Sequence, residues 1–208
     1  MEFYDVINER CTIRDFEDRE VDLEIIQRII DAGLKAPTND HLRSWEFVVI
    51  TDKEEKAKVI SRIKKNSSKE EVTNFLDSYN MTDTLQREMY MDGVPKQYSM
   101  LYRGGCLILP FFRQDYPLLK PETINSLNNF ASIWCCIENM LLATTAEGLG
   151  AAFRIPFPDE LPYLKEYLGH PDHYHLPCYI SIGYPAKNAS KPKQYHFDPK
   201  DKIHINRW

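Results

Sequence analysis

Two arginines and a threonine alternate near the amino terminus, in the run Arg10-Cys11-Thr12-Ile13-Arg14. In an extended segment alternate side chains point to the same side, so Arg10, Thr12 and Arg14 would face one ligand. Two guanidinium groups and a hydroxyl can bind phosphate oxygens through charge-assisted hydrogen bonds. The spacing therefore indicates a phosphate site. The alternative is a loop in which both arginines pair with the acidic residues that follow them.

A polar loop between the first long helical pattern and the first strand pattern is a second candidate site. Such loops leave polar groups free to bind a ligand, and Thr38, Asn39 and His41 could bind the edge of a ring. The alternative is an ordinary turn, in which Pro37 fixes its own φ and Asn39 and Asp40 supply the bend.

A run of small residues, Gly148-Leu149-Gly150-Ala151-Ala152, separates a predicted helix from a predicted strand. A planar ligand could approach this backbone closely, because glycine has no side chain in the way. The alternative is a plain helix stop. The run is not a dinucleotide-binding fingerprint, since that motif follows a strand, opens a helix and has a third glycine.

Histidines and cysteines predict no further site. The series His170, His173, His175 and Cys178 matches no zinc spacing, so we predict no metal. The five cysteines are an odd number without a C-x-x-C pair, which is typical of reduced thiols. No nucleophilic cysteine is predicted, because Cys11 has no evident histidine partner.

Hydrophobic periodicity predicts the elements that position these residues. Helices are predicted at residues 2–9, 22–34, 52–65, 122–147 and 159–168, with helical patches at 69–79 and 82–92. Strands are predicted at residues 45–51, 106–112, 151–155 and 177–184. Because helices and strands do not alternate strictly, we expect an α+β fold with a sheet of four or five strands.

The chain length predicts a single domain over residues 1–208. Its polar stretch at about 66–104 is interpreted as a variable helical cap beside the site. The long helical pattern, with Ile133, Trp134, Ile137 and Met140, is apolar around much of its circumference, which favours a homodimer. The tail from residue 186 ends in apolar side chains, which favours its docking on another surface.

Composition argues against several partners. There are 31 acidic and 26 basic residues, a net charge of −5, so no overall basic surface attracts nucleic acid or an anionic membrane. The longest strongly apolar stretch, residues 106–112, is far shorter than the roughly 20 residues of a membrane helix. The amino terminus lacks the features of a secretory signal, and we expect a cytoplasmic protein.

Taken together, these segments resemble the flavin-dependent nitroreductase family. The signature R-x-S-x-[RK]-x-[FY] is matched by residues 10–16, with Thr12 in place of the usual serine. The signature A-P-S-x-x-N-x-Q-P-W-x-F is met in part by residues 36–47, where His41, Arg43 and Ser44 depart from it.

Two further motifs carry the resemblance. The helix pattern Q-N-L-L-L-A-A-x-x-x-G-L-G is matched by residues 138–150, which begin with Glu138 rather than glutamine. A G-Y-P motif is matched by residues 183–185. The resemblance thus covers about residues 3–185 in the right order, with the stretch at 66–104 unmatched.

The resemblance implies an α+β homodimer, with a central, mostly antiparallel sheet flanked by helices and two FMN molecules at the subunit interface. NADH or NADPH would reduce the FMN, and a nitroaromatic, quinone or related small molecule would reoxidise it in a ping-pong cycle. The flavin carries this chemistry, so no catalytic side chain is predicted. The alternatives are a flavin-fragmenting or dehalogenating relative, and a flavin-binding or flavin-delivery protein with little turnover.

The resemblance also implies roles for individual residues. Arg10 and Thr12 would hold the FMN phosphate, and Arg14 would reach the ribityl chain or the N1/O2 edge of the ring, where a cation favours the reduced cofactor. The other predicted contacts are Pro37, Thr38 and His41 from the partner subunit, Ala152, Phe153 and Arg154 on the other side of the ring, and His204 or Arg207 at the phosphate.

Overall fold

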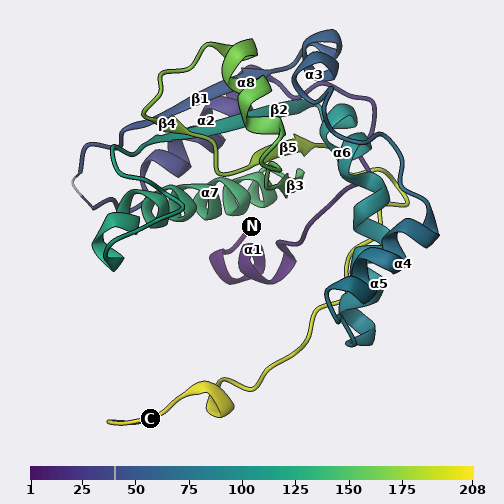
Figure 1. The fold of residues 1–208 in the computed structure, drawn as a ribbon. Helices are drawn as coiled ribbons and strands as arrows, with labels where there is room; N and C mark the ends of the chain where they lie inside the picture. Colours follow the sequence, from purple (N-terminus) through teal and green to yellow (C-terminus); the bar gives the residue numbers. More distant parts are fainter. Residues whose placement is uncertain (40) are drawn as a thin grey trace.

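A computed structural model describes residues 1–39 and 41–208 of the chain, and within these residues five strands form one sheet (Figure 1). The strands are β1 (Trp45–Ile50), β2 (Cys106–Arg113), β3 (Gly150–Arg154), β4 (Tyr174–His175) and β5 (Tyr179–Gly183). Their order is β1-β2-β5-β3, with β4 paired to β2, and all of these pairings are antiparallel. The prediction of an α+β fold with a mostly antiparallel sheet is confirmed.

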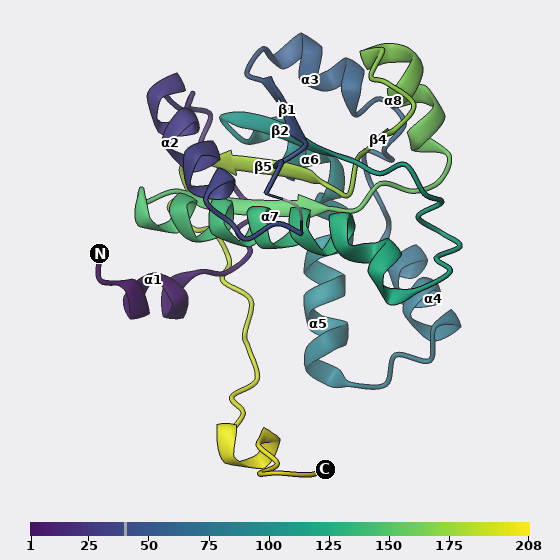
Figure 2. The same ribbon diagram turned by 90° about the vertical axis from the view of Figure 1, so that its left-hand side faces the viewer.

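Helices cover both faces of the sheet (Figures 1 and 2). The α-helices of the described residues are α1 (Phe3–Glu9), α2 (Leu23–Leu34), α3 (Lys53–Val59), α4 (Lys69–Ser78), α5 (Thr84–Gly93), α6 (Gln97–Arg103), α7 (Asn128–Ala146) and α8 (Glu160–Leu168). On one face α2 and α7 pack on alternate β2 side chains such as Ile108 and Phe112. On the other face, residues of α3, α6 and α8 pack on Leu107, Leu109 and Phe111.

Two predicted helices are shorter than the sequence pattern suggested. The helix that starts after Asp52 ends at Val59 rather than near residue 65. Ile60 and Ile63 beyond it are buried, but they belong to a turn and not to a continued helix. The long helix begins at Asn128, after a 3₁₀ turn at Ile124–Leu127, rather than at residue 122. Apolar residues three apart suit a turn as well as a helix, so the periodicity does not distinguish the two.

The long helix α7 is used mainly within one chain. Of the apolar residues that favoured a homodimer, Ile133, Ile137 and Met140 are buried in the core of one chain, whereas Trp134 is partly buried. The close approach of α2 requires Gly33, because a Cβ there would lie 2.7 Å from the Cγ of Met140. A homodimer stays a prediction.

The segment predicted as a helical cap contains α4, α5 and α6, and α4 and α5 lie to one side of the sheet (Figure 1). Helix α4 begins with a capping box between Ser68 and Glu71, and Arg87 of α5 pairs with Asp77 of α4 at 2.8 Å. This pairing and the loop between α4 and α5 make a helical hairpin. Its carboxyl end, at Gly93, lies beside the side chain of Arg14.

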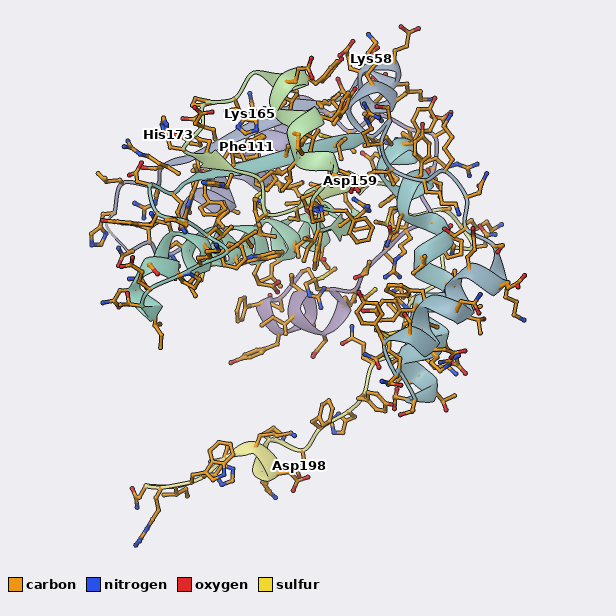
Figure 3. All side chains as sticks on the ribbon, viewed as in Figure 1. Lys58, Phe111, Asp159, Lys165, His173 and Asp198 are labelled. Carbon is orange, nitrogen blue, oxygen red and sulfur yellow. The ribbon has the colours of Figure 1, made fainter. Side chains whose placement is uncertain are left out.

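The carboxyl-terminal tail extends away from the rest of the chain in both views, with Asp198 well out along it (Figures 1, 2 and 3). Its first part contacts the cap, where the hydroxyl of Tyr195 donates to Asp83 at 2.5 Å. Its end is exposed, including Ile205 and Trp208. None of the described helices is long and apolar enough to cross a membrane.

Candidate functional site

The amino-terminal arginine segment, residues 10–16, leaves α1 and runs along the edge of the sheet. Thr12 forms a parallel bridge with Ala151 of β3, and the amide of Ile13 donates to the Ala151 carbonyl at 2.9 Å. Phe16 forms a second bridge, with Pro185. The segment is therefore extended, as predicted, and two bridges fix its register.

The alternation of side chains places Thr12 and Arg14 together. Ile13 is buried against Gly150, where an added Cβ would approach its side chain to 2.7 Å. Thr12 and Arg14 line one cavity of about 720 Å³, whose other walls come from α5 and the tail. Arg10 does not line this cavity and instead lies near Glu138 of α7.

Both arginines of the segment have only distant acidic partners. The Nε of Arg10 lies 3.7 Å from Glu138, and an Nη of Arg14 lies 3.8 Å from Asp92. These separations exceed the range of a good charge-assisted hydrogen bond. Among the described residues no hydrogen bond saturates either guanidinium, so both retain donors for an anion.

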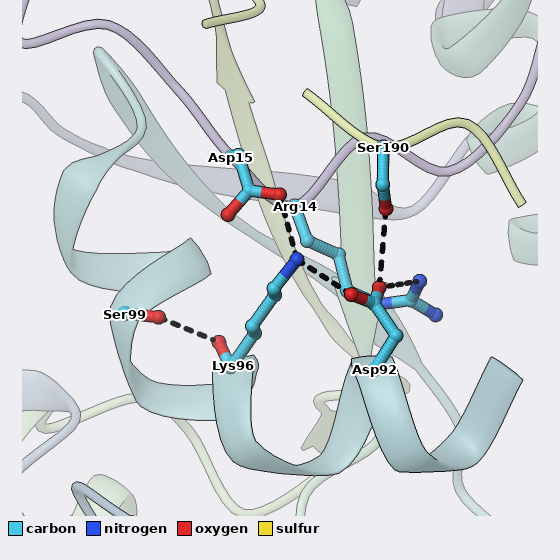
Figure 4. A network of polar contacts seen from close by, with 6 residues as sticks. All are labelled: Arg14, Asp15, Asp92, Lys96, Ser99 and Ser190. Atoms are coloured by element: carbon cyan, nitrogen blue, oxygen red, sulfur yellow. Dashed lines mark hydrogen bonds and ion pairs between the residues drawn. The ribbon is translucent and has the colours of Figure 1, made fainter. Parts of the chain in front are cut away.

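Arg14 belongs to a polar network at the end of α5 (Figure 4). One oxygen of Asp92 accepts from Lys96 at 2.7 Å and the other from Ser190 at 3.4 Å, while Lys96 also donates to Asp15 at 2.7 Å. Partial burial lowers the pKa of Lys96, but hydrogen bonds and charge interactions with Asp15 and Asp92 outweigh this and raise that pKa above its ordinary value.

The predicted ring-binding loop forms a separate pocket. Thr38 lines a cavity of about 250 Å³, and none of its described lining residues also lines the cavity at Arg14. Both His41 and Arg43 adopt left-handed backbone angles, with φ of 60° and 47°, and Arg43 donates to the Leu34 carbonyl at 2.6 Å. The loop is thus shaped by more than a simple bend, and Asp40 lies outside the described residues.

One atom of this loop lacks a partner. The hydroxyl oxygen of Thr38 is buried and makes no hydrogen bond with any described residue. A buried polar atom without a partner is costly, and such an atom in a ligand site is explained when a ligand satisfies it. These groups fit the two parts of an FMN: the unsaturated guanidinium groups of Arg10 and Arg14 suit its phosphate and ring edge, and the unpartnered Thr38 hydroxyl suits its ring.

The three predicted residues of β3 differ from one another. Ala152 is buried, and Phe153 is partly exposed with its ring edge-to-face with Trp134. Arg154 is buried and makes a bidentate ion pair with Glu160, at 2.5 and 2.6 Å. Its guanidinium is therefore used within the chain, and of the three side chains Phe153 has the greatest access to a ligand.

The remaining predicted contacts, His204 and Arg207, are not brought to the arginine segment. His204 stacks on Trp208 with ring centroids 4.5 Å apart, and the end of the tail lies away from the sheet (Figure 2).

Pro37, another predicted contact, is exposed in the loop beside Thr38.

The sequence reasoning missed Asp92, Lys96 and Glu138 as neighbours of the arginines. The i,i+4 spacing of Asp92 and Lys96 indicates a helical ion pair, but nothing local indicates that it faces Arg14. Glu138 was visible as a departure from glutamine in the helix signature. Burial raises the pKa of both the Cys106 and Cys136 thiols to about 12, as expected of inert core cysteines, whereas Cys135 is exposed.

The chain is similar to known proteins over most of its length. The model of the Nitroreductase family matches residues 7–184. An iodotyrosine deiodinase of Haliscomenobacter hydrossis is 29% identical over 195 residues, which cover 92% of this chain and 82% of that protein. A protein of Methanothermobacter thermautotrophicus, described as a putative NADH dehydrogenase/NAD(P)H nitroreductase, is 26% identical over 216 residues, which cover 100% of this chain and 88% of that protein.

The fold comparison gives the same picture. A crystal structure of oxidized iodotyrosine deiodinase bound to FMN and 3-iodo-L-tyrosine has a TM-score of 0.74 at 19% identity and covers 100% of both chains. The likeness at that identity establishes the fold alone. The chain spans 64% of the length of the human iodotyrosine deiodinase 1 that it also matches, at 28% identity over 92% of its own length.

Proposed function

Because the chain belongs to the nitroreductase family, we propose that it is an FMN-dependent NAD(P)H:acceptor oxidoreductase. The observation that carries the proposal is the fixed, extended arginine segment, which presents Thr12 and Arg14 to one cavity while Arg10 and Arg14 keep unsaturated guanidinium groups. A net-negative protein needs such local cations to bind a phosphate dianion.

The residues have distinct tasks in this proposal. Arg10 neutralises the phosphate, and the hydroxyl of Thr12 donates a hydrogen bond to it. Arg14, on the same side as Thr12, binds the ribityl chain or the N1/O2 edge of the ring, where its positive charge stabilises added electron density. Phe153, partly exposed on β3, would pack along the ring.

A second copy of the chain completes the proposed site. Within one chain, Thr38 and Arg14 line separate cavities, and in this proposal a flavin reaches both types of residue across two subunits. In a homodimer the loop of one subunit, with Pro37, Thr38 and His41, would face the arginine segment of the other. The orphaned Thr38 hydroxyl would then hydrogen-bond the ring.

When bound, FMN would supply the redox chemistry between NADH or NADPH and a nitroaromatic, a quinone or a related acceptor. The protein binds and orients the reactants. No proton donor on the protein is part of the proposal, and the neutral, apolar thiols Cys106 and Cys136 take no part.

Reductive dehalogenation is the second candidate, and the similarity to iodotyrosine deiodinases over 92% of this chain favours it. It uses the same flavin and the same cation at the ring edge, and differs in the acceptor. A flavin-delivery protein with little turnover is the remaining alternative.

The experiment is an anaerobic titration of the purified protein. We expect a yellow protein that NADH or NADPH bleaches and that a nitroaromatic or a quinone reoxidises. Reoxidation of the dithionite-reduced protein by 3-iodo-L-tyrosine, with release of iodide, would identify the dehalogenase instead. A yellow protein that neither nicotinamide bleaches and no acceptor reoxidises would contradict both enzymatic proposals and favour flavin delivery.

A further inference from the structure

We propose that the carboxyl-terminal end of α5, through Asp92 and Gly93, positions the guanidinium of Arg14 at the flavin, so that the cap controls how Arg14 meets the ring. The inference rests on the proposed function, because it assumes that a flavin lies at Arg14. It concerns positioning residues, which act on the flavin through Arg14.

The first observation is the packing of Arg14 on the helix backbone. A Cβ added to Gly93 would lie 3.1 Å from three atoms of the Arg14 guanidinium, Cζ, Nε and an Nη. Gly93 has helical angles, φ −77° and ψ −40°, so its backbone does not require glycine. Glycine is explained at this position by the room that it leaves for the flat face of the guanidinium.

The second observation is the acidic partner beside that face. The carboxylate of Asp92 lies 3.8 Å from an Nη of Arg14, with Arg14 22% and Asp92 36% exposed. At this distance Asp92 attracts and orients the guanidinium without saturating its donors. Arg14 therefore keeps N–H groups for a ligand while its position is restrained.

The third observation is that Asp92 is itself held. Lys96 donates to Asp92 and to Asp15, both at 2.7 Å, and Ser190 of the tail donates to Asp92 at 3.4 Å (Figure 4). Since Asp15 is the next residue after Arg14, the network joins the arginine segment, the turn between α5 and α6, and the start of the tail. The network contains two cations, Arg14 and Lys96, and two carboxylates, Asp15 and Asp92, so the net charge of these four groups is zero.

The network connects the cap to the flavin site. A shift of α5 would move Asp92 and Gly93 together and carry the Arg14 guanidinium with them. The cavity at Arg14 also has Leu85 and Met89 of α5 in its wall, so the same helix shapes the space beside the ring. An acceptor that packs on α5 would therefore change the position of the ring-edge cation.

The test uses Asp92→Asn, which keeps size and helical position but removes the charge. We expect the riboflavin dissociation constant of the apoprotein to rise about twofold to fivefold, the range for a partly exposed ion pair. The midpoint potential of the bound flavin should become more negative, in the same direction as in Arg14→Ala, because a displaced guanidinium no longer stabilises the reduced ring. In an Arg14→Ala background, Asp92→Asn should change neither quantity.

Two further variants make the test specific. Gly93→Ala keeps the Asp92 charge, favours the helix and crowds the guanidinium, so it should also weaken riboflavin binding. Asp77→Asn is the matched control, because it breaks another cap ion pair, to Arg87, away from Arg14. It should leave riboflavin affinity and potential unchanged.

Each other outcome overturns the inference. A more positive potential in Asp92→Asn would mean that Asp92 acts only as a nearby negative charge. If Asp77→Asn changes riboflavin affinity and potential as much as Asp92→Asn does, the effect is a general one of the cap. If Asp92→Asn still changes them in the Arg14→Ala background, Asp92 acts independently of Arg14. If Arg14→Ala itself leaves riboflavin binding and potential unchanged, the ring-edge role of Arg14 is wrong, and a protein that binds no flavin refutes the proposed function as well.

Discussion

The arginine segment and the end of β3 both present arginines that the sequence assigned to the flavin, but the two regions treat them differently. Arg10 and Arg14 are 28% and 22% exposed, and the described carboxylates that they pair with lie 3.7 and 3.8 Å away. Arg154 is 5% exposed and donates to both carboxylate oxygens of Glu160 and to Gln97 at 3.0 Å. The hydroxyl of Tyr179 in turn donates to Glu160. The number and distance of the partners distinguish Arg154, which is satisfied within the chain, from Arg10 and Arg14, which we propose bind a ligand.

The difference follows from solvation. A buried guanidinium without matched acceptors is strongly unfavourable, so Arg154 is stable only because Glu160, itself buried, satisfies it. Arg10 and Arg14 remain partly in water and can exchange that water for phosphate or ring oxygens at little cost. We therefore expect changes at Arg154 to act on stability and changes at Arg10 and Arg14 to act on binding.

The largest effect is expected at the structural pair. Glu160→Gln leaves Arg154 buried without a counter-charge and should lower the free energy of unfolding by about 3–5 kcal/mol. Urea denaturation of the apoprotein measures this. The double replacement Arg154→Met with Glu160→Leu is the control and should recover much of the loss. A loss below about 1 kcal/mol in Glu160→Gln would be typical of an exposed pair and would remove the distinction between the two regions.

The second effect is on cofactor affinity. Arg10→Ala removes a charge-assisted partner of the phosphate and should cost about 1.5–3 kcal/mol, roughly a 10- to 150-fold loss in FMN affinity. Riboflavin, which lacks the phosphate, should bind almost unchanged, and urea denaturation should show little change because Glu138 is a distant partner. Equal losses for FMN and riboflavin would mean that Arg10 does not bind the phosphate.

A smaller, opposite effect is expected at the neighbour of Arg10. Glu138 is 53% exposed and stands where the family signature has glutamine, so its charge opposes the phosphate and competes for Arg10. Glu138→Gln should strengthen FMN binding by up to about fivefold, with the gain reduced by added salt. Titration with FMN and riboflavin measures it, and a gain that is equal for both ligands would exclude an effect at the phosphate.

The smallest expected effect concerns a third kind of cation. Lys56 is buried, and among the described residues its one hydrogen-bond acceptor is the Gly104 carbonyl at 2.6 Å. Burial lowers the pKa of Lys56 below the ordinary 10.5. Between the lowered pKa and 10.5 the unfolded state binds more protons, so stability rises with pH across that window. Lys56→Met should lack this rise. The free energy of unfolding of the wild type, relative to that of Lys56→Met, should therefore increase with pH, as measured by urea denaturation at several pH values. Parallel pH profiles would show that Lys56 is not penalised by burial.

The sequence allowed much of the fold to be predicted, because strands such as Cys106–Arg113 and the glycine after α8 have strong local signals. The missed strand β4 has only two residues, Tyr174 and His175, and exists through its pairing with β2. Local pattern cannot reveal an element that a neighbour defines.

The site was predictable where spacing alone decides it. The alternation in the arginine segment predicted that Arg10, Thr12 and Arg14 face one side; Thr12 and Arg14 line one cavity, whereas Arg10 does not line it. The partners of each arginine come from positions far along the chain: Glu138 for Arg10, and Asp92 for Arg14. Glu160 lies only six residues from Arg154, yet the pairing depends on burial under α8, which periodicity does not specify. For this reason the sequence could not separate the structural arginine from the other two.

The most direct measurement is the affinity of the wild-type apoprotein for FMN and for riboflavin at low and high salt. If loosely paired arginines hold a phosphate dianion, FMN binds at least about tenfold more tightly than riboflavin, and this ratio falls as salt screens the charges. If riboflavin binds as tightly as FMN at low salt, the arginine segment does not bind a phosphate and the account is wrong.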